Sequence, residues 1–73
     1  MTDEQLLEKI AYQPNKIGVL TKLKGNKALV EIYFEYDKDV RYRFKFKSVH
    51  SARNFLGVVG ISKYTEKDKS KEN

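Results

Sequence analysis

The chain has 73 residues, no cysteine, and fifteen lysine and arginine residues against ten acidic ones, which gives a formal net charge of +5. This length allows one small domain with a thin core, and the absence of cysteine excludes disulfides and thiolate metal sites. No segment is apolar enough to span a bilayer, and the first residues lack the basic and apolar regions of a secretory signal. We therefore expect a single cytoplasmic domain whose positive charge favours polyanionic partners.

The first predicted element is a short helix that starts after Thr2. Thr2 and Gln5 have the spacing of a capping box, in which each side chain bonds to the backbone of the other residue. The apolar side chains that then share one helical face are Leu6, Leu7, Ile10 and Ala11. Pro14 disfavours helical backbone at the residue before it, so we expect the helix to end by about Gln13.

Three segments with alternating apolar residues follow and predict an antiparallel sheet. They are residues 17–23, 28–36 and 40–47. Residues 25–26 suit a two-residue type II′ turn, and residues 37–39 suit a three-residue turn. These turns would place Val19 opposite Ile32, and Ile32 opposite Phe44. Both hairpins then give the middle strand the same core face, which supports the register.

A second helix is predicted to begin at Ser48, its N-cap, and to end at Gly57. Its inward side chains would be Val49, Ala52, Phe55 and Leu56. Residues 58–61 are a candidate short fourth strand, whereas residues 63–73 are polar and are predicted to form a disordered charged tail. The expected fold is α+β, a single domain over residues 1–62. It would consist of a three-stranded antiparallel sheet in α-β-β-β-α order, with helices on one face.

The other face of this sheet would carry most of the net charge. In the predicted register it displays eight basic side chains against two acidic ones, Glu31 and Glu35. The basic ones are Lys16, Lys22, Lys24, Lys27, Arg41, Arg43, Lys45 and Lys47. Arg41 would pair with Glu35 and Lys45 with Glu31, which is ordinary for a solvated sheet. The cluster left unpaired would be Lys22, Lys24, Lys27 and Lys47.

The centre of the same face would hold Tyr33 between Gly18 and Arg43. Aromatic side chains flanked by basic ones stack on bases and bind phosphates; the alternative is that the ring only covers the glycine. The candidate nucleic-acid-binding residues are therefore Lys22, Lys24, Lys27, Tyr33, Arg41, Arg43, Lys45 and Lys47. Leu20 and Leu29 would be exposed nearby and suit a protein interface as well.

The sequence contains no catalytic constellation. His50 is the single histidine, which together with the lack of cysteine excludes most metal sites and nucleophile–base pairs. Glu31 and Glu35 lie four residues apart on one strand, but their basic neighbours would keep both carboxylates ionised, which argues against a general acid. We expect a protein without enzymatic activity and without a cofactor.

The third strand and second helix read Phe-Lys-Phe-Lys-Ser-Val-His-Ser-Ala-Arg-Asn-Phe-Leu from Phe44 to Leu56. This segment, after the other two strands, resembles the arm-site DNA-binding domain at the N-terminus of tyrosine-type phage integrases. In that family a third strand leads through a phenylalanine into a helix with an alanine and a leucine end, and the exposed sheet face enters the major groove. The DNA-contacting residues that the resemblance implies are Lys22, Tyr33, Arg41, Arg43 and Lys45.

The α-β-β-β-α order is also similar to the double-stranded-RNA-binding domain. Residues 48–53 keep that family's serine, alanine and a basic residue but lack its lysine pair, so the likeness is one of topology alone. We predict a nucleic-acid-binding or accessory regulatory protein of phage or plasmid type, with DNA favoured over RNA. The competing hypothesis is an inhibitor or adaptor that docks on an acidic surface of a partner protein.

Overall fold

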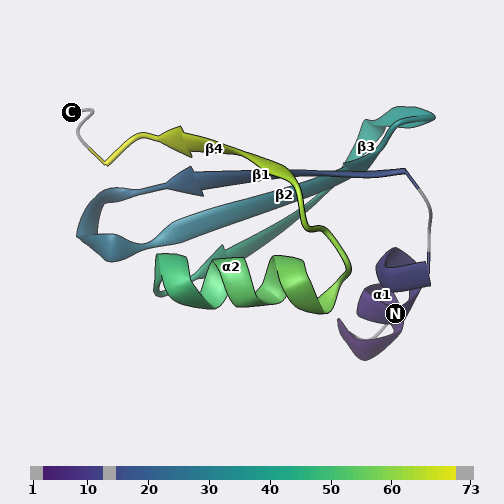
Figure 1. Cartoon of the computed structure of the whole chain (residues 1–73), viewed down its shortest axis with the longest axis horizontal. Coiled ribbons are helices and arrows are strands. Elements are labelled where there is room, and N and C mark those ends of the chain that lie inside the picture. The colour runs from purple at the N-terminus through teal and green to yellow at the C-terminus, as the bar shows by residue number, and fades with distance from the viewer. Residues whose placement is uncertain (1–2, 13–14, 71–73) are drawn as a thin grey trace.

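The computed structural model describes residues 3–12 and 15–70, and Figure 1 shows how its elements are arranged. The helices are α1 (Asp3–Tyr12) and α2 (Val49–Val58). The strands are β1 (Lys16–Lys22), β2 (Ala28–Phe34), β3 (Asp37–Phe46) and β4 (Tyr64–Asp68). Within these residues the strands form one mixed sheet in the order β3-β2-β1-β4, with both helices on one face. The predicted α+β class is confirmed, while the predicted cap at Thr2 lies outside the described residues.

The core lies between the helices and the sheet. Ile10 of α1 and Leu56 of α2 are fully buried. They pack against even-numbered residues of β1 and β2, which are Leu20, Ala28, Val30 and Ile32. Phe44 and Phe46 of β3 extend this core, because their rings lie 4.7 and 5.1 Å from the ring of Phe55 in α2. The predictions of which side chains face the core are therefore confirmed for α2 and for the paired parts of β2 and β3.

The face predicted for β1 is wrong, because the first turn is one residue longer than predicted. Residues 24–26 form the connection, which is closed by a hydrogen bond of 2.8 Å from the Leu23 N–H to the Lys27 carbonyl. Gly25 and Asn26 have φ angles of 74° and 62°, a conformation that glycine adopts freely and asparagine tolerates. The pairing with β2 shifts by one residue, and every side chain of β1 moves to the opposite face.

Gly18 consequently faces the helices and not the ring of Tyr33. A Cβ atom at this position would lie 3.1 Å from Ile61 Cγ2 and 3.2 Å from Leu56 Cδ2. These distances are shorter than ordinary contacts between carbon atoms. The glycine therefore allows the end of α2 and the following loop to approach β1 closely.

Gly18→Ala is expected to lower the free energy of unfolding by about 1–3 kcal/mol, because the new methyl group overpacks this contact. Urea unfolding followed by circular dichroism measures the loss. Gly57→Ala is the matched control, since a Cβ atom at Gly57 meets no atom within 4 Å. The control is expected to be neutral or to stabilise the helix by up to about 1 kcal/mol. Equal losses in both variants would contradict the close approach at Gly18.

The turn between β2 and β3 occupies residues 35–36 and not residues 37–39 as predicted. An irregularity beside this turn shifts the pairing, so that Phe44 lies opposite Val30 and not opposite Ile32. This difference from the predicted register is two residues. A shift by two leaves every side chain on the same face, which is why the predicted faces of β2 and β3 hold although their partners differ.

Helix α2 has defined caps at both ends. The Ser48 hydroxyl accepts a hydrogen bond of 3.1 Å from the Ser51 N–H, as predicted for an N-cap. The helix runs past its predicted end and stops in a Schellman motif, in which Gly60 has a φ of 82°. The Ile61 N–H then donates to the Leu56 carbonyl at 2.8 Å. Both of these side chains are buried, which attaches the end of the helix to the core.

The segment predicted to be a disordered tail contains the fourth strand. β4 runs parallel to β1 with Lys22 opposite Asp68, and the Lys69 N–H donates to the Lys22 carbonyl at 2.8 Å. Tyr64 packs on the core, whereas the other residues of β4 are exposed. This polarity explains why composition indicated a tail. The candidate fourth strand at residues 58–61 is wrong, since these residues end α2 and begin the loop that follows it.

Candidate nucleic-acid interface

The sheet face opposite the helices, called here the open face, carries odd-numbered residues of the four strands that the structure describes. Strand pairing arranges their side chains in three rows across the sheet. The rows are Lys45-Leu29-Thr21-Lys67, Arg43-Glu31-Val19-Thr65 and Arg41-Tyr33-Ile17. Neighbouring strands lie about 4.8 Å apart, so β3 and β4 stand about 14 Å apart across three spacings. Basic residues therefore occupy both margins of the open face.

The middle of the open face is mostly apolar, and its side chains are buried or half-buried. β1 is an inner strand between β2 and β4, and its Val19 and Thr21 are 9% and 5% exposed. Ile17 and Leu29 beside them are half-buried. This burial arises without a helix on the open face in the described part of the chain. The result is a strip of mostly apolar side chains, interrupted by Thr21 and Glu31, between two basic margins.

Glu31 is the acidic side chain in these three rows, and it binds both arginines of β3. Its Oε2 lies 3.3 Å from Nε of Arg43 and 3.7 Å from Nη1 of Arg41, and the side chain is 16% exposed. The predicted pairing of Glu31 with Lys45 is wrong because the second hairpin has a different register. Within the described residues, Lys45 and Lys67 form no ion pair.

Tyr33 carries a guanidinium group over its ring, as the sequence predicts, but the partner differs. The Cζ atom of Arg41 lies 4.9 Å from the ring centroid, whereas the prediction placed Arg43 there. On the other side the strand partner of Tyr33 is Ile17 and not Gly18. A cation–π contact of this kind contributes about 0.5–1 kcal/mol at a partly exposed site. It holds a planar cation beside a half-buried ring, which is a suitable surface for stacking.

The structure brings together half of the predicted site residues. The four that share the open face are Tyr33, Arg41, Arg43 and Lys45. Three others, Lys24, Lys27 and Lys47, are exposed near the Ala28–Phe46 pair, at the end of the sheet where β1 turns into β2. Lys22 points to the helix side, so the predicted cluster of four unpaired lysines is wrong.

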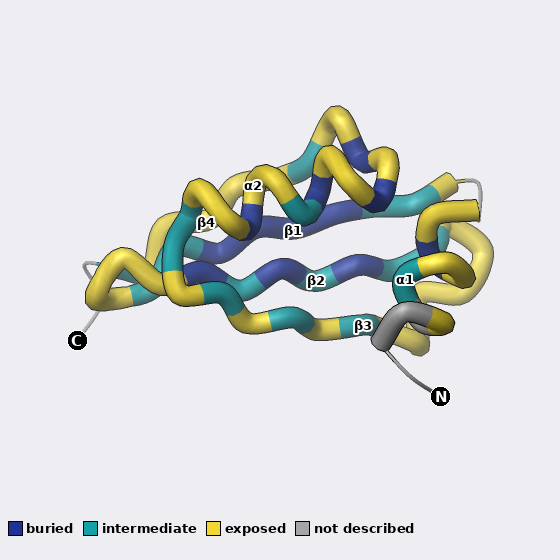
Figure 2. Tube along the Cα trace, turned by 90° about the horizontal axis from the view of Figure 1, so that it is seen from below, coloured by how far each residue is buried: buried dark blue, intermediate teal, exposed yellow. Residues whose placement is uncertain are grey.

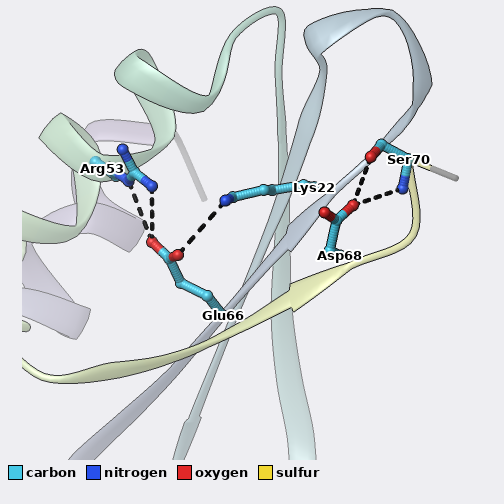
Figure 3. Close-up of polar contacts among 5 residues, drawn as sticks. All are labelled: Lys22, Arg53, Glu66, Asp68 and Ser70. Atoms are coloured by element: carbon cyan, nitrogen blue, oxygen red, sulfur yellow. Dashed lines mark hydrogen bonds and ion pairs between the residues drawn. The ribbon is translucent and has the colours of Figure 1, made fainter.

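Lys22 belongs to an ion-pair network on the helix side of the sheet, shown in Figure 3. Its Nζ lies 3.8 Å from Glu66 Oε2, and Arg53 of α2 lies 3.1 Å from Glu66 Oε1. Asp68 accepts hydrogen bonds from the backbone and the hydroxyl of Ser70 at the end of β4. Because the paired groups are at least a third exposed, each pair contributes about 0–1 kcal/mol. The network links β4 to β1 and α2.

Lys16 also lies on the helix side of the sheet and not on the open face, where the sequence predicts it. Its Nζ donates to the Ala11 carbonyl at 2.8 Å and to the Val59 carbonyl at 2.6 Å. These carbonyls lie in the last turn of α1 and at the C-cap of α2. A lysine here satisfies carbonyls that have no partner within a helix. Lys16 therefore has a structural role in joining the two helix ends to β1.

Lys67 is the basic residue of the open face that sequence reasoning missed, because its segment was assigned to a tail. A signal was present, since Glu66 and Asp68 alternate with Lys67 and Lys69. A period of two is typical of a strand. The signal is weak in a segment with one large apolar residue, and no nearby turn pairs it with another strand.

Comparison with protein families, with curated proteins and with solved structures finds no match for this chain. Among residues 3–12 and 15–70, no three His, Cys, Asp or Glu side chains gather as a metal-ion site, and no helix is long and apolar enough to cross a membrane. The open face is therefore the feature of the molecule from which we propose a function.

Proposed function

We propose that this chain is a nucleic-acid-binding protein whose open face contacts the phosphate backbone. The observation that carries the proposal is the pair of basic margins, formed by Arg41, Arg43 and Lys45 on β3 and by Lys67 on β4. Lysine and arginine contacts to phosphates supply most of the affinity that does not depend on base sequence. Lys45 and Lys67 can make such contacts without giving up an ion pair to another described residue.

The spacing of the margins favours a DNA duplex. Backbones about 14 Å apart carry lysine side chains that can reach phosphates on both sides of a major groove about 12 Å wide. The major groove of duplex RNA is deep and narrow, which disfavours entry of a sheet face. This mode is the one implied by the resemblance to integrase arm-site domains, and it supports DNA as the partner.

We propose a binding role without catalysis, as an accessory or regulatory protein of phage or plasmid type. The carboxylate of Glu31 forms ion pairs with Arg41 and Arg43, which suits it to holding these side chains in place. The stacked pair of Arg41 and Tyr33 adds a planar surface beside the basic margin of β3. Such a surface adds contact to sugars or bases and requires no reactive group.

The first test is a salt titration of binding to a fluorescein-labelled DNA duplex of mixed sequence, followed by anisotropy. We expect a dissociation constant in the micromolar range or lower at low salt. Four phosphate contacts from the two margins predict a slope of about −3 to −4 for log affinity against log salt. An affinity that does not change with salt would contradict phosphate binding.

The second test reverses charge at both margins. Lys45→Glu combined with Lys67→Glu is expected to weaken duplex binding by about a hundredfold, because each margin then repels phosphate. The matched control is Lys38→Glu with Lys63→Glu, two exposed lysines outside the three rows. It changes the net charge equally and is expected to weaken binding by less than about fivefold. Equal losses in the two double variants would mean that net charge alone acts and would refute the open face as the site.

A further inference from the structure

The outer edge of β3 is a free strand edge beside an apolar groove. β3 is the terminal strand of the sheet and pairs with β2 alone among the described residues. Figure 2 shows β3 along the margin of the sheet, seen from the side that carries the helices. A groove of about 350 Å³ lies beside this strand, and its lining residues are Leu7, Arg43, Phe44, Lys45, Phe46 and Phe55.

Two hydrogen bonds establish which backbone groups of β3 point away from the sheet. At the ends of the β1–β2 ladder, Leu23 N–H donates to the Lys27 carbonyl and Glu35 N–H donates to the Asn15 carbonyl. The backbone N–H and C=O groups of odd-numbered residues in β1 and β2 therefore form the hydrogen bonds between these two strands. Because bonding alternates along an antiparallel ladder, even-numbered residues of β2 bond to even-numbered residues of β3. In the regularly paired part of β3, residues 41–46, the residues whose N–H and C=O groups point outward are Arg41, Arg43 and Lys45.

We propose that this edge binds an extended segment of a partner protein, with alternating acidic and apolar residues, as an added strand. Added strands gain affinity from main-chain hydrogen bonds and specificity from alternate side chains. Acidic side chains of the segment would lie opposite Arg43 and Lys45 on the open face. Its apolar side chains would lie opposite Phe44 and Phe46 and enter the groove on the helix side.

The same charges argue against a second copy of this chain as the occupant. Two β3 edges that pair with each other over residues 41–45 can bond only through their outward-pointing backbone groups, which belong to Arg41, Arg43 and Lys45 in both copies. Every bonded pair would place two cations opposite each other, and like charges in this position destabilise a sheet. An acidic strand replaces each repulsion by an attraction, so charge complementarity selects an acidic partner.

Substitutions at Arg43 distinguish peptide binding at the edge from phosphate binding at the open face. An added strand needs the outward N–H of Arg43, whereas a phosphate needs its charge. Arg43→Gln removes the charge alone. Arg43→Pro also removes the outward N–H and occupies the space of the added strand, while the bonds to β2 remain.

The probe is a capped fluorescent peptide of alternating glutamate and leucine, and its control has the same composition with the glutamates grouped at one end. We expect the alternating peptide to bind at least about tenfold more tightly than the grouped one. Arg43→Gln is expected to weaken binding of the alternating peptide about threefold to tenfold, and Arg43→Pro is expected to weaken it about tenfold further. Duplex DNA is expected to bind the two variants with the same affinity as each other, because both lack the charge of Arg43. Failure of either proposal therefore leaves the other testable.

Hydrogen exchange measured by NMR tests the proposal on the unaltered protein. The outward amides of Arg41, Arg43 and Lys45 are expected to exchange rapidly in the free protein and at least about tenfold more slowly with the alternating peptide at saturation. The amide of Phe44, which bonds to β2, is the internal control and should change little. Equal binding of the two peptides, equal affinity of the two Arg43 variants, or unchanged exchange at the three outward amides would overturn the proposal. The exchange measurement tests the proposal even if Arg43→Pro fails to fold, because it uses the unaltered protein.

Discussion

Leu20→Ala is expected to lower the free energy of unfolding by about 2–5 kcal/mol, because it removes a side chain that is fully buried in the core. Small domains have a total stability of roughly 5–15 kcal/mol, so the variant should unfold at a markedly lower urea concentration. The loss has a specific origin in the three-residue turn at residues 24–26, which turns Leu20 toward the helices. Urea unfolding followed by circular dichroism measures it.

Leu29→Ala is the matched control for this experiment. The sequence predicts the same exposed position for Leu20 and Leu29, whereas the structure keeps only Leu29 on the open face, where it is half-buried. Its truncation is expected to cost about 1 kcal/mol, in proportion to the smaller area removed from water. Similar small losses for Leu20→Ala and Leu29→Ala would show that β1 has the predicted register, in which both side chains are exposed, and not the one observed.

Lys67→Pro is expected to lower the free energy of unfolding by about 2–4 kcal/mol, although Lys67 is exposed. The Lys69 N–H donates to the Lys22 carbonyl, and alternation along the strand directs the Lys67 N–H toward β1 as well. Proline has no N–H and cannot continue an inner ladder. Loss of this pairing would release β4 and expose one side of β1.

The control at the same position is Lys67→Thr, which removes the charge and keeps the N–H. It should change the free energy of unfolding by no more than about 0.5 kcal/mol, as is usual for an exposed site. Thermal unfolding of the two variants beside the original chain makes the comparison. If residues 63–73 formed a disordered tail, proline would be tolerated as well as threonine, and the two variants would have the same melting temperature.

β4 links the stability of this protein to its proposed binding surface. The strand supplies Lys67 to one basic margin, and its pairing makes β1 an inner strand. Its other side carries Glu66, which binds Lys22 and Arg53. A substitution that releases β4 should therefore weaken duplex binding as well as stability. Lys67→Thr is expected to affect the binding and leave the fold intact.

The sequence was most informative where one strand face is apolar and the other is polar. Phe44 and Phe46 alternate with Arg43 and Lys45, and only one orientation of β3 buries the rings and solvates the charges. For the same reason Tyr33, Arg41, Arg43 and Lys45 were correctly placed on one face. The partner of each charge was not predictable, because the irregularity beside residues 35–36 shifts the pairing by two residues.

The α+β class, the faces of β2 and β3, and the N-cap at Ser48 were determined by the sequence itself, since each depends on local periodicity or local hydrogen bonding. Tertiary structure decided the orientation of β1 and the existence of β4. β1 has apolar residues on both faces because it is an inner strand, so its hydrophobic pattern does not select one orientation. The turn length and the close approach at Gly18 select it. β4 is a polar strand held by pairing with a segment more than forty residues earlier in the chain, and no local signal encodes such a contact.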